Sequence, residues 1–141
     1  MGERVHAVLV DAGPLVALLD RSDPHHAACR SALESIRDPL ATVWPALTEA
    51  MSLLGFSWEA QSALWEMVET EVLRLLPLDH RDAARMKELM RKYRTLPMDL
   101  ADAALVCVAE RERLRRIFTL DRRDFQTYRP SRLGRFSIIP A

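Results

Sequence analysis

The stretch VHAVLVDAGP, residues 5–14, has the composition of a short buried strand that ends in a turn. Its apolar part, residues 5–10, is rich in β-branched side chains, and Gly13 and Pro14 follow as turn residues. Such runs are typical of strands in parallel sheets that are covered on both faces. Asp11 stands at the carboxyl end of the run, where an ionised carboxylate is costly unless a cation or hydrogen-bond donors compensate it.

The remainder of the chain alternates between strand and helix patterns. Further strands are expected at residues 40–44, 72–77, 117–120 and 136–139. Helices are expected at residues 15–19, 24–36, 45–55, 57–70, 79–93 and 99–113, with Asp23 capping the second. The arginine-rich stretch before the last strand is expected to be irregular. Strands separated by helices pair in parallel, so the sequence predicts a three-layer α/β/α sandwich with a central, mostly parallel five-stranded sheet, in one domain spanning residues 1–141.

Three further acids occupy positions comparable to that of Asp11. Glu49 and Asp102 lie near the starts of apolar helices, and Asp121 follows the fourth expected strand. Because ligands of open parallel sheets bind outside the carboxyl ends of the strands, we expect one pocket to collect all four acids. Carboxylates without histidine or cysteine partners suit Mg²⁺ or Mn²⁺, which support phosphodiester hydrolysis.

Each of these acids also has a purely structural interpretation. Asp11 could bond the backbone of Gly13 as a turn residue, and Glu49 could be favoured by a helix dipole. Asp99 is expected to cap the helix at 99–113, with Asp102 as its capping partner.

Asp124 competes with Asp121 for the fourth place in the acidic group. It could instead cap the short turn before Phe125. Asp121 is preferred because it lies closer to the strand end.

Composition narrows the functional classes. Of the 141 residues, 49% are apolar, but no run is long enough to span a bilayer and no signal peptide is evident, so we expect a cytoplasmic protein without membrane contact. Cys29 and Cys107 have no metal-ligand spacing and predict no disulfide. The net charge is zero, but residues 111–141 hold nine arginines against three acids, which weakly favours a phosphate-bearing partner.

Four sequence segments resemble the PIN-domain nucleases, and within them the VapC-like toxins of bacterial and archaeal toxin–antitoxin pairs. The segments are VDAGPL at residues 10–15, LTEA at 47–50, DLADA at 99–103 and TLDRRDF at 119–125. The resemblance implies that the metal-binding and catalytic acids are Asp11, Glu49, Asp102 and Asp121. It also implies accessory roles for Asp99 and Asp124, and a role for Thr119 in orienting carboxylates.

The same resemblance implies a function: a Mg²⁺- or Mn²⁺-dependent endoribonuclease toxin that forms a homodimer and is inhibited by a cognate VapB-like antitoxin. A stand-alone RNA-processing or DNA nuclease with this fold remains an alternative. A non-catalytic signalling module is disfavoured, because Ala12 follows Asp11 where a phosphorylation receiver would have a second acid, and no lysine occurs beyond Lys92.

Some arginine and tryptophan residues also have competing interpretations. Arg122 and Arg123 adjoin Asp121 and are candidates for RNA phosphate contacts. Trp58 and Trp65 lie seven residues apart on one expected helix, so they either pack internally or form an apolar surface patch.

Overall fold

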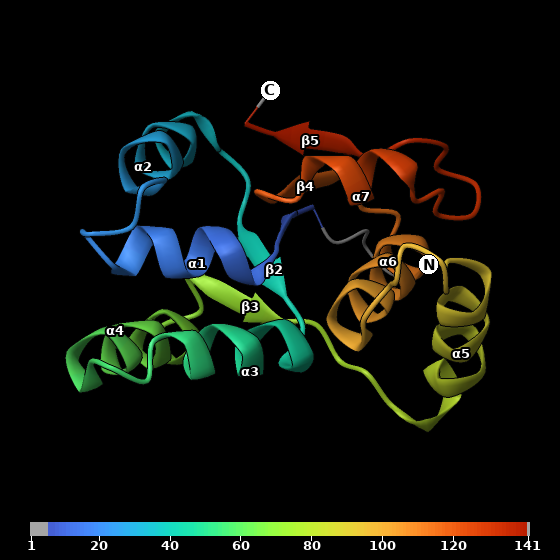
Figure 1. Ribbon diagram of the computed structural model, residues 1–141, viewed down its shortest axis with the longest axis horizontal. Coiled ribbons are helices and arrows are strands. Elements are labelled where there is room, and N and C mark those ends of the chain that lie inside the picture. Colours follow the sequence, from blue (N-terminus) through green and yellow to red (C-terminus); the bar gives the residue numbers. More distant parts are fainter. Residues whose placement is uncertain (1–5, 141) are drawn as a thin grey trace.

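The computed structural model describes residues 6–140, which form a five-stranded, entirely parallel sheet with helices on both faces (Figure 1). The strands are β1 (Val8–Val10), β2 (Leu40–Thr42), β3 (Leu73–Leu75), β4 (Arg116–Phe118) and β5 (Ser137–Ile139). Their order in the sheet is β3-β2-β1-β4-β5. The predicted three-layer α/β fold is therefore confirmed, and the sheet is parallel throughout.

Seven α-helices and one 3₁₀ turn connect these strands within the described residues. They are α1 (Ala12–Leu19), α2 (His26–Ser35), α3 (Trp44–Leu53), α4 (Trp58–Glu69), a 3₁₀ turn η1 (His80–Asp82), α5 (Ala83–Lys92), α6 (Leu100–Glu112) and α7 (Arg122–Thr127).

Alternate residues of each central strand enter two separate cores. In β1, Val8 and Val10 pack with residues of α1 to α4, whereas Leu9 packs with residues of α5 and α6. In β4, Phe118 and Ile117 divide in the same way. This period of two places an apolar face on each side of the sheet, as expected for strands covered by two helical layers.

The strand order creates a crevice beside β1. The chain passes from β1 to β2 and β3 on one side, then returns to β4 and β5 on the other. Ligand sites of open α/β sheets form where the order reverses in this way, outside the carboxyl ends of the strands. Asp11 directly follows β1 and Asp121 follows β4 closely, so both lie at this crevice.

Several local predictions need correction. Trp44 begins α3 instead of ending β2, and α7 occupies part of the stretch expected to be irregular. The N-cap of α2 is His25, without a side-chain cap, because the Asp23 carboxylate accepts from the His25 N–H in the preceding turn. Val5, in the first expected strand, lies outside the described residues.

Cys29 and Cys107 are both buried and free. Among residues 6–140, no helix combines the length and apolar character needed to cross a bilayer.

Candidate active site

Asp11 is fixed at the point where β1 passes into α1. It is the N-cap of α1, and its Oδ1 accepts from the Ala12 N–H at 2.9 Å, so the donor is Ala12 and not Gly13. Its Oδ2 accepts from the Thr119 hydroxyl at 2.9 Å. Both carboxylate oxygens are therefore held by hydrogen bonds from the protein.

Thr119 connects the ends of the two central strands. Its side chain is fully buried just beyond β4. While its hydroxyl donates to Asp11, the same oxygen accepts from the Asp121 N–H at 3.0 Å. One hydroxyl thus fixes the Asp11 carboxylate relative to the backbone of Asp121.

The start of α6 provides two more carboxylates. Asp99 caps the helix as predicted, and its Oδ1 accepts from the Asp102 N–H at 2.8 Å. This cap fixes the first turn and leaves the Asp102 side chain buried, with 8% of its surface exposed.

The carboxylate of Asp102 has a partner that sequence analysis missed. The Tyr128 hydroxyl donates to Asp102 Oδ2 at 2.8 Å, and both groups are buried. The Tyr128 ring is held edge-on against Tyr93 and Phe125, with centroids 5.0 and 5.1 Å away. No sequence pattern pairs residues 26 positions apart, so only the fold reveals this contact.

Asp121 and Asp124 lie together at the start of α7. Asp121 is the N-cap, and its Oδ1 accepts from the Asp124 N–H at 3.4 Å. One carboxylate oxygen from each of Asp102, Asp121 and Asp124 lies within 4.8 Å of the other two. Asp121 also lines the pocket beside Asp11, whereas Asp124 does not.

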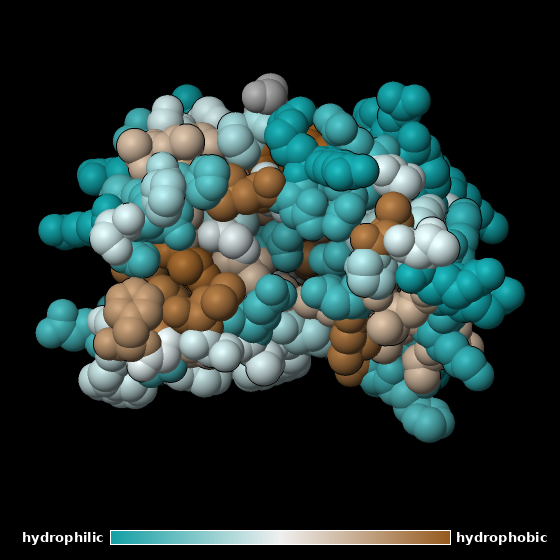
Figure 2. Space-filling view, in the orientation of Figure 1, coloured by the Kyte–Doolittle hydropathy of each residue, from teal (hydrophilic) through white to brown (hydrophobic). Residues whose placement is uncertain are grey.

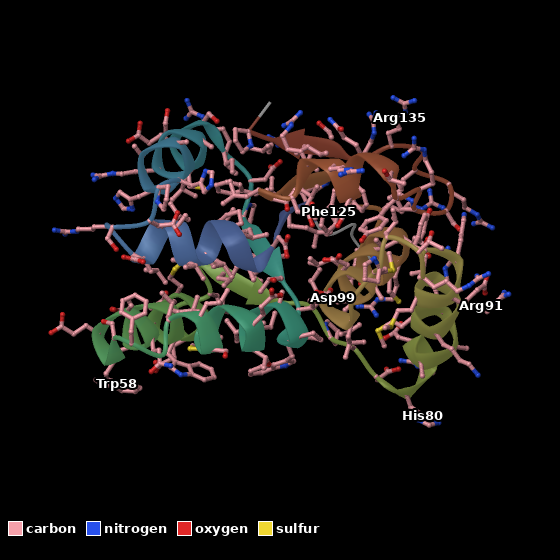
Figure 3. All side chains as sticks on the ribbon, viewed as in Figure 1. Trp58, His80, Arg91, Asp99, Phe125 and Arg135 are labelled. Carbon is pink, nitrogen blue, oxygen red and sulfur yellow. The ribbon has the colours of Figure 1, made fainter. Side chains whose placement is uncertain are left out.

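The predicted acids converge on one pocket of about 380 Å³, here called the acidic pocket. Its lining residues are Asp11, Ala12, Gly13, Glu49, Asp99, Asp102, Leu120 and Asp121. No basic side chain is among them. Figure 3 shows Asp99 at the start of α6, near the middle of the molecule. The structure therefore brings together the four acids that the sequence placed at the rim, and Asp99, expected as an accessory acid, lines the same pocket.

The surroundings of these acids favour their neutral forms. Burial, followed by the charges of Asp99, Asp11 and Asp121, raises the pKa of Asp102 to about 8, although the Tyr128 hydrogen bond opposes the shift. Loss of hydration also raises the pKa values of Asp11 and Glu49, and the nearby carboxylates add to both shifts. The pKa of Asp121 is raised by loss of hydration and by Asp124.

Carboxylates crowded in this way, without a cation among them, form an oxygen-only donor set. Hard divalent cations such as Mg²⁺ and Mn²⁺ prefer these ligands. Proteins retain ionisable groups in such unfavourable surroundings chiefly at functional sites. A parallel sheet with this cluster at its reversal point defines a class of α/β domains with an acidic site that could hold a divalent metal ion.

Comparison with known proteins identifies the family. Residues 8–129 match the PIN domain, and the chain therefore belongs to the PIN-domain family. It is 30% identical over 135 residues to Ribonuclease VapC26 of Mycobacterium tuberculosis, an alignment that covers 94% of this chain and 100% of that protein. Within the PIN-domain family, the chain accordingly belongs with the VapC proteins.

Solved structures share the fold at low sequence identity. M. tuberculosis VapC20, a Sarcin-Ricin loop cleaving toxin, matches with a TM-score of 0.75 at 17% identity, covering 82% of this chain and 91% of its own. A toxin–antitoxin complex from Klebsiella pneumoniae matches with a TM-score of 0.66 at 20% identity, covering 85% and 91%. VapBC2 of Rickettsia felis, bound to a promoter DNA fragment, matches with a TM-score of 0.65 at 11% identity, covering 94% and 98%.

The aromatic residues of α3 and α4 lie largely at the surface. Trp58 is 69% exposed and Trp65 is 37% exposed, which favours the surface-patch interpretation over internal packing. Trp44 and Phe56 are also exposed, and the Trp44 and Trp65 rings lie 6.3 Å apart. Figure 2 shows apolar side chains reaching the surface on the side of the molecule where α1 and α4 lie.

Proposed function

We propose that this protein is a metal-dependent endoribonuclease of a toxin–antitoxin pair, which hydrolyses phosphodiester bonds of RNA in the cytoplasm. The observation that carries the proposal is the acidic pocket, where four aspartates and Glu49 converge without a basic residue at the reversal point of the sheet. Its support from relatives is the similarity to Ribonuclease VapC26 along nearly the whole chain.

The donor set of the acidic pocket fits a divalent metal ion. We assign Asp11, Glu49, Asp102 and Asp121 as metal-binding and catalytic acids, with Asp99 and Asp124 as accessory acids. Bound Mg²⁺ or Mn²⁺ would supply an activated water and stabilise the charge that develops during phosphodiester hydrolysis.

The chain's own residues hold this donor set in place before any ligand binds. Thr119 orients Asp11 and the backbone of Asp121, and Tyr128 orients Asp102 from the buried side. Among residues 6–140, no protein donor bonds Asp102 Oδ1, so that oxygen remains available as a ligand. Preorganisation of this kind reduces the rearrangement needed when substrate arrives.

The first turn of α7 would hold the RNA backbone next to these acids. Arg122 and Arg123 are exposed and directly follow Asp121, and guanidinium groups suit bidentate contact with phosphate. We assign both arginines as RNA-binding residues.

We further propose an antitoxin partner and a homodimer. The similar structures from Klebsiella and Rickettsia are a toxin–antitoxin complex and VapBC2. The exposed aromatic side chains on α3 and α4 offer an apolar surface suited to a protein contact.

The proposal is tested by incubating the purified protein with a pool of cellular RNA and Mg²⁺ or Mn²⁺. We expect cleavage that chelator abolishes and that Asp11→Asn removes without unfolding the protein, as judged by circular dichroism. Matched single-stranded DNA serves as a second substrate. Cleavage of DNA alone, or RNA cleavage that survives both chelator and Asp11→Asn, would contradict the assignment.

A further inference from the structure

The arginines of the C-terminal segment differ in how they are paired. Arg111 bonds Asp82 and Glu112, and Arg116 bonds Asp38. Within residues 6–140, the other arginines of this segment make no ion pair, namely Arg113, Arg115, Arg122, Arg123, Arg129, Arg132 and Arg135. Their positive charge is therefore available to an anionic partner.

Two of these arginines line a pocket of about 450 Å³ between α7 and β5, here called the arginine pocket. Its lining residues are Arg122, Gln126, Arg135, Phe136 and Ile138, with no acid among them. Arg122 is held in place because its guanidinium donates to the carbonyl oxygen of Pro140. Figure 3 shows Arg135 extending outward from the body of the molecule near α7 and β5.

The arginine pocket and the acidic pocket meet at the N-terminus of α7. Asp121, the cap of this helix, lines the acidic pocket, and Arg122, its first residue, lines the arginine pocket. A polyanion with one of its charged groups at the acidic pocket would therefore extend past Arg122. The carboxylates by themselves repel such a polyanion, so cationic contacts beside them are needed to retain it.

We propose that the arginine pocket binds the flanking segment of a single-stranded RNA whose adjacent phosphodiester lies at the acidic pocket. Arg122 and Arg135 contact backbone phosphates, Gln126 offers an amide to a sugar or base, and Phe136 and Ile138 form an apolar floor. This inference rests on the proposed nuclease function and adds Arg135 and Gln126 to its binding surface. An acidic protein segment is the competing occupant, and competition with an acidic peptide distinguishes it from RNA.

The test measures binding of a fluorescein-labelled, mixed-sequence, single-stranded RNA 12-mer by anisotropy in chelator, where no metal-dependent cleavage occurs. Arg122→Gln and Arg135→Gln are compared with Arg132→Gln, a matched control that removes the same charge three residues before Arg135. Arg132 is exposed and lines neither the arginine pocket nor the acidic pocket. A charge-matched decaglutamate peptide serves as competitor.

Each pocket variant should lower the slope of log affinity against log salt by about 0.7, the contribution of one single-strand phosphate contact. At about 0.15 M salt, that slope corresponds to roughly fourfold weaker binding. The Arg132 variant should change affinity less than twofold. Equal effects from all three variants, absence of RNA binding by the wild type, or equally effective competition by decaglutamate would each overturn the inference.

The two proposals fail separately. Absence of metal-dependent cleavage together with the expected arginine pattern would refute the nuclease function and leave an RNA-binding pocket. Normal cleavage with an Arg135 variant that binds like the Arg132 variant would refute only the pocket.

Discussion

The acidic pocket contrasts with a second group of carboxylates, which consists of Asp79 and Asp82 at η1 and Glu110 in α6. In this second group, here called the ion-paired cluster, Arg85 bonds Glu110 at 2.7 Å and Arg111 bonds Asp82 at 2.9 Å. Asp79 pairs with Arg81 at 2.8 Å. The two regions hold the same kinds of acid and border pockets of similar size, about 380 and 330 Å³.

Their titration behaviour is opposite. Hydrogen bonds from Arg81 lower the pKa of Asp79 to about 2. The pKa of Asp82 is lowered by a hydrogen bond from the Asp79 N–H and by the nearby Arg111. Burial alone would raise the pKa of Glu110, but Arg85 and the Ser131 N–H outweigh it and the net shift is downward. In the acidic pocket, burial raises the pKa values of Asp11, Glu49, Asp102 and Asp121. Cation partners, and not acid content, therefore separate structural carboxylates from those held ready for a ligand.

The largest expected difference between the two regions comes from neutralising one acid in each of them. Asp102→Asn should abolish RNA cleavage and leave the unfolding free energy of the metal-free protein unchanged or higher, because it removes a group whose ionised form the pocket disfavours. Glu110→Gln should keep cleavage and lower stability by about 2 kcal/mol, since Arg85 loses its main partner. Cleavage assays and urea unfolding measure both properties, and a destabilised Asp102 variant with full activity would reverse the contrast.

The two regions should also differ in how their contribution to stability depends on pH. In the metal-free protein, the pKa of Asp102 is about 8 against roughly 3.9 when unfolded, so the folded state binds more protons between these values. Stability should therefore fall as pH rises from 5 to 8, by up to about 1.4 kcal/mol per pH unit. The ion-paired carboxylates, with lowered pKa values, are ionised in both states across this range and lose their contribution only at more acidic pH.

Urea unfolding in chelator from pH 5 to pH 8 measures this slope. Asp102→Asn should flatten it, whereas Glu110→Gln should retain it. A wild-type protein with no slope would show that the carboxylates of the acidic pocket ionise normally without metal.

The smallest expected effect concerns the two buried tyrosines behind the acidic pocket. Tyr128→Phe removes the donor to Asp102 and should weaken Mn²⁺ binding about tenfold, the usual effect of losing a hydrogen bond to a metal ligand. Tyr93→Phe is the control, because its hydroxyl accepts from the Arg129 N–H and, within residues 6–140, bonds no carboxylate. Each variant should cost about 1 kcal/mol of stability. Calorimetric Mn²⁺ titration that shows equal losses would assign Tyr128 a structural role only.

Sequence analysis could place the acids because their positions depend only on the order of strands and helices. Once the strands are parallel, residues following β1 and β4 must share a rim, and the apolar start of α6 directs Asp102 toward it. The Asp99 cap was likewise predictable from residue type and spacing.

Contacts between distant segments were beyond prediction. The bond from Tyr128 to Asp102 depends on how α7 packs against α6, which no local pattern encodes. The helix α7 itself has six residues, of which only Phe125 is buried, so it lacks the apolar stripe by which longer helices are identified. Capping at α2 was predicted wrongly because aspartate also stabilises tight turns.

The placement of the indole rings makes the molecule spectroscopically informative. All three tryptophans of the chain, Trp44, Trp58 and Trp65, belong to α3 and α4, and each is at least 37% exposed. Intrinsic emission therefore originates from the surface formed by α4 and by α3, the helix that also carries Glu49. Any protein that covers this surface should shift the emission to shorter wavelengths, so the unlabelled chain reports its own association in a cuvette.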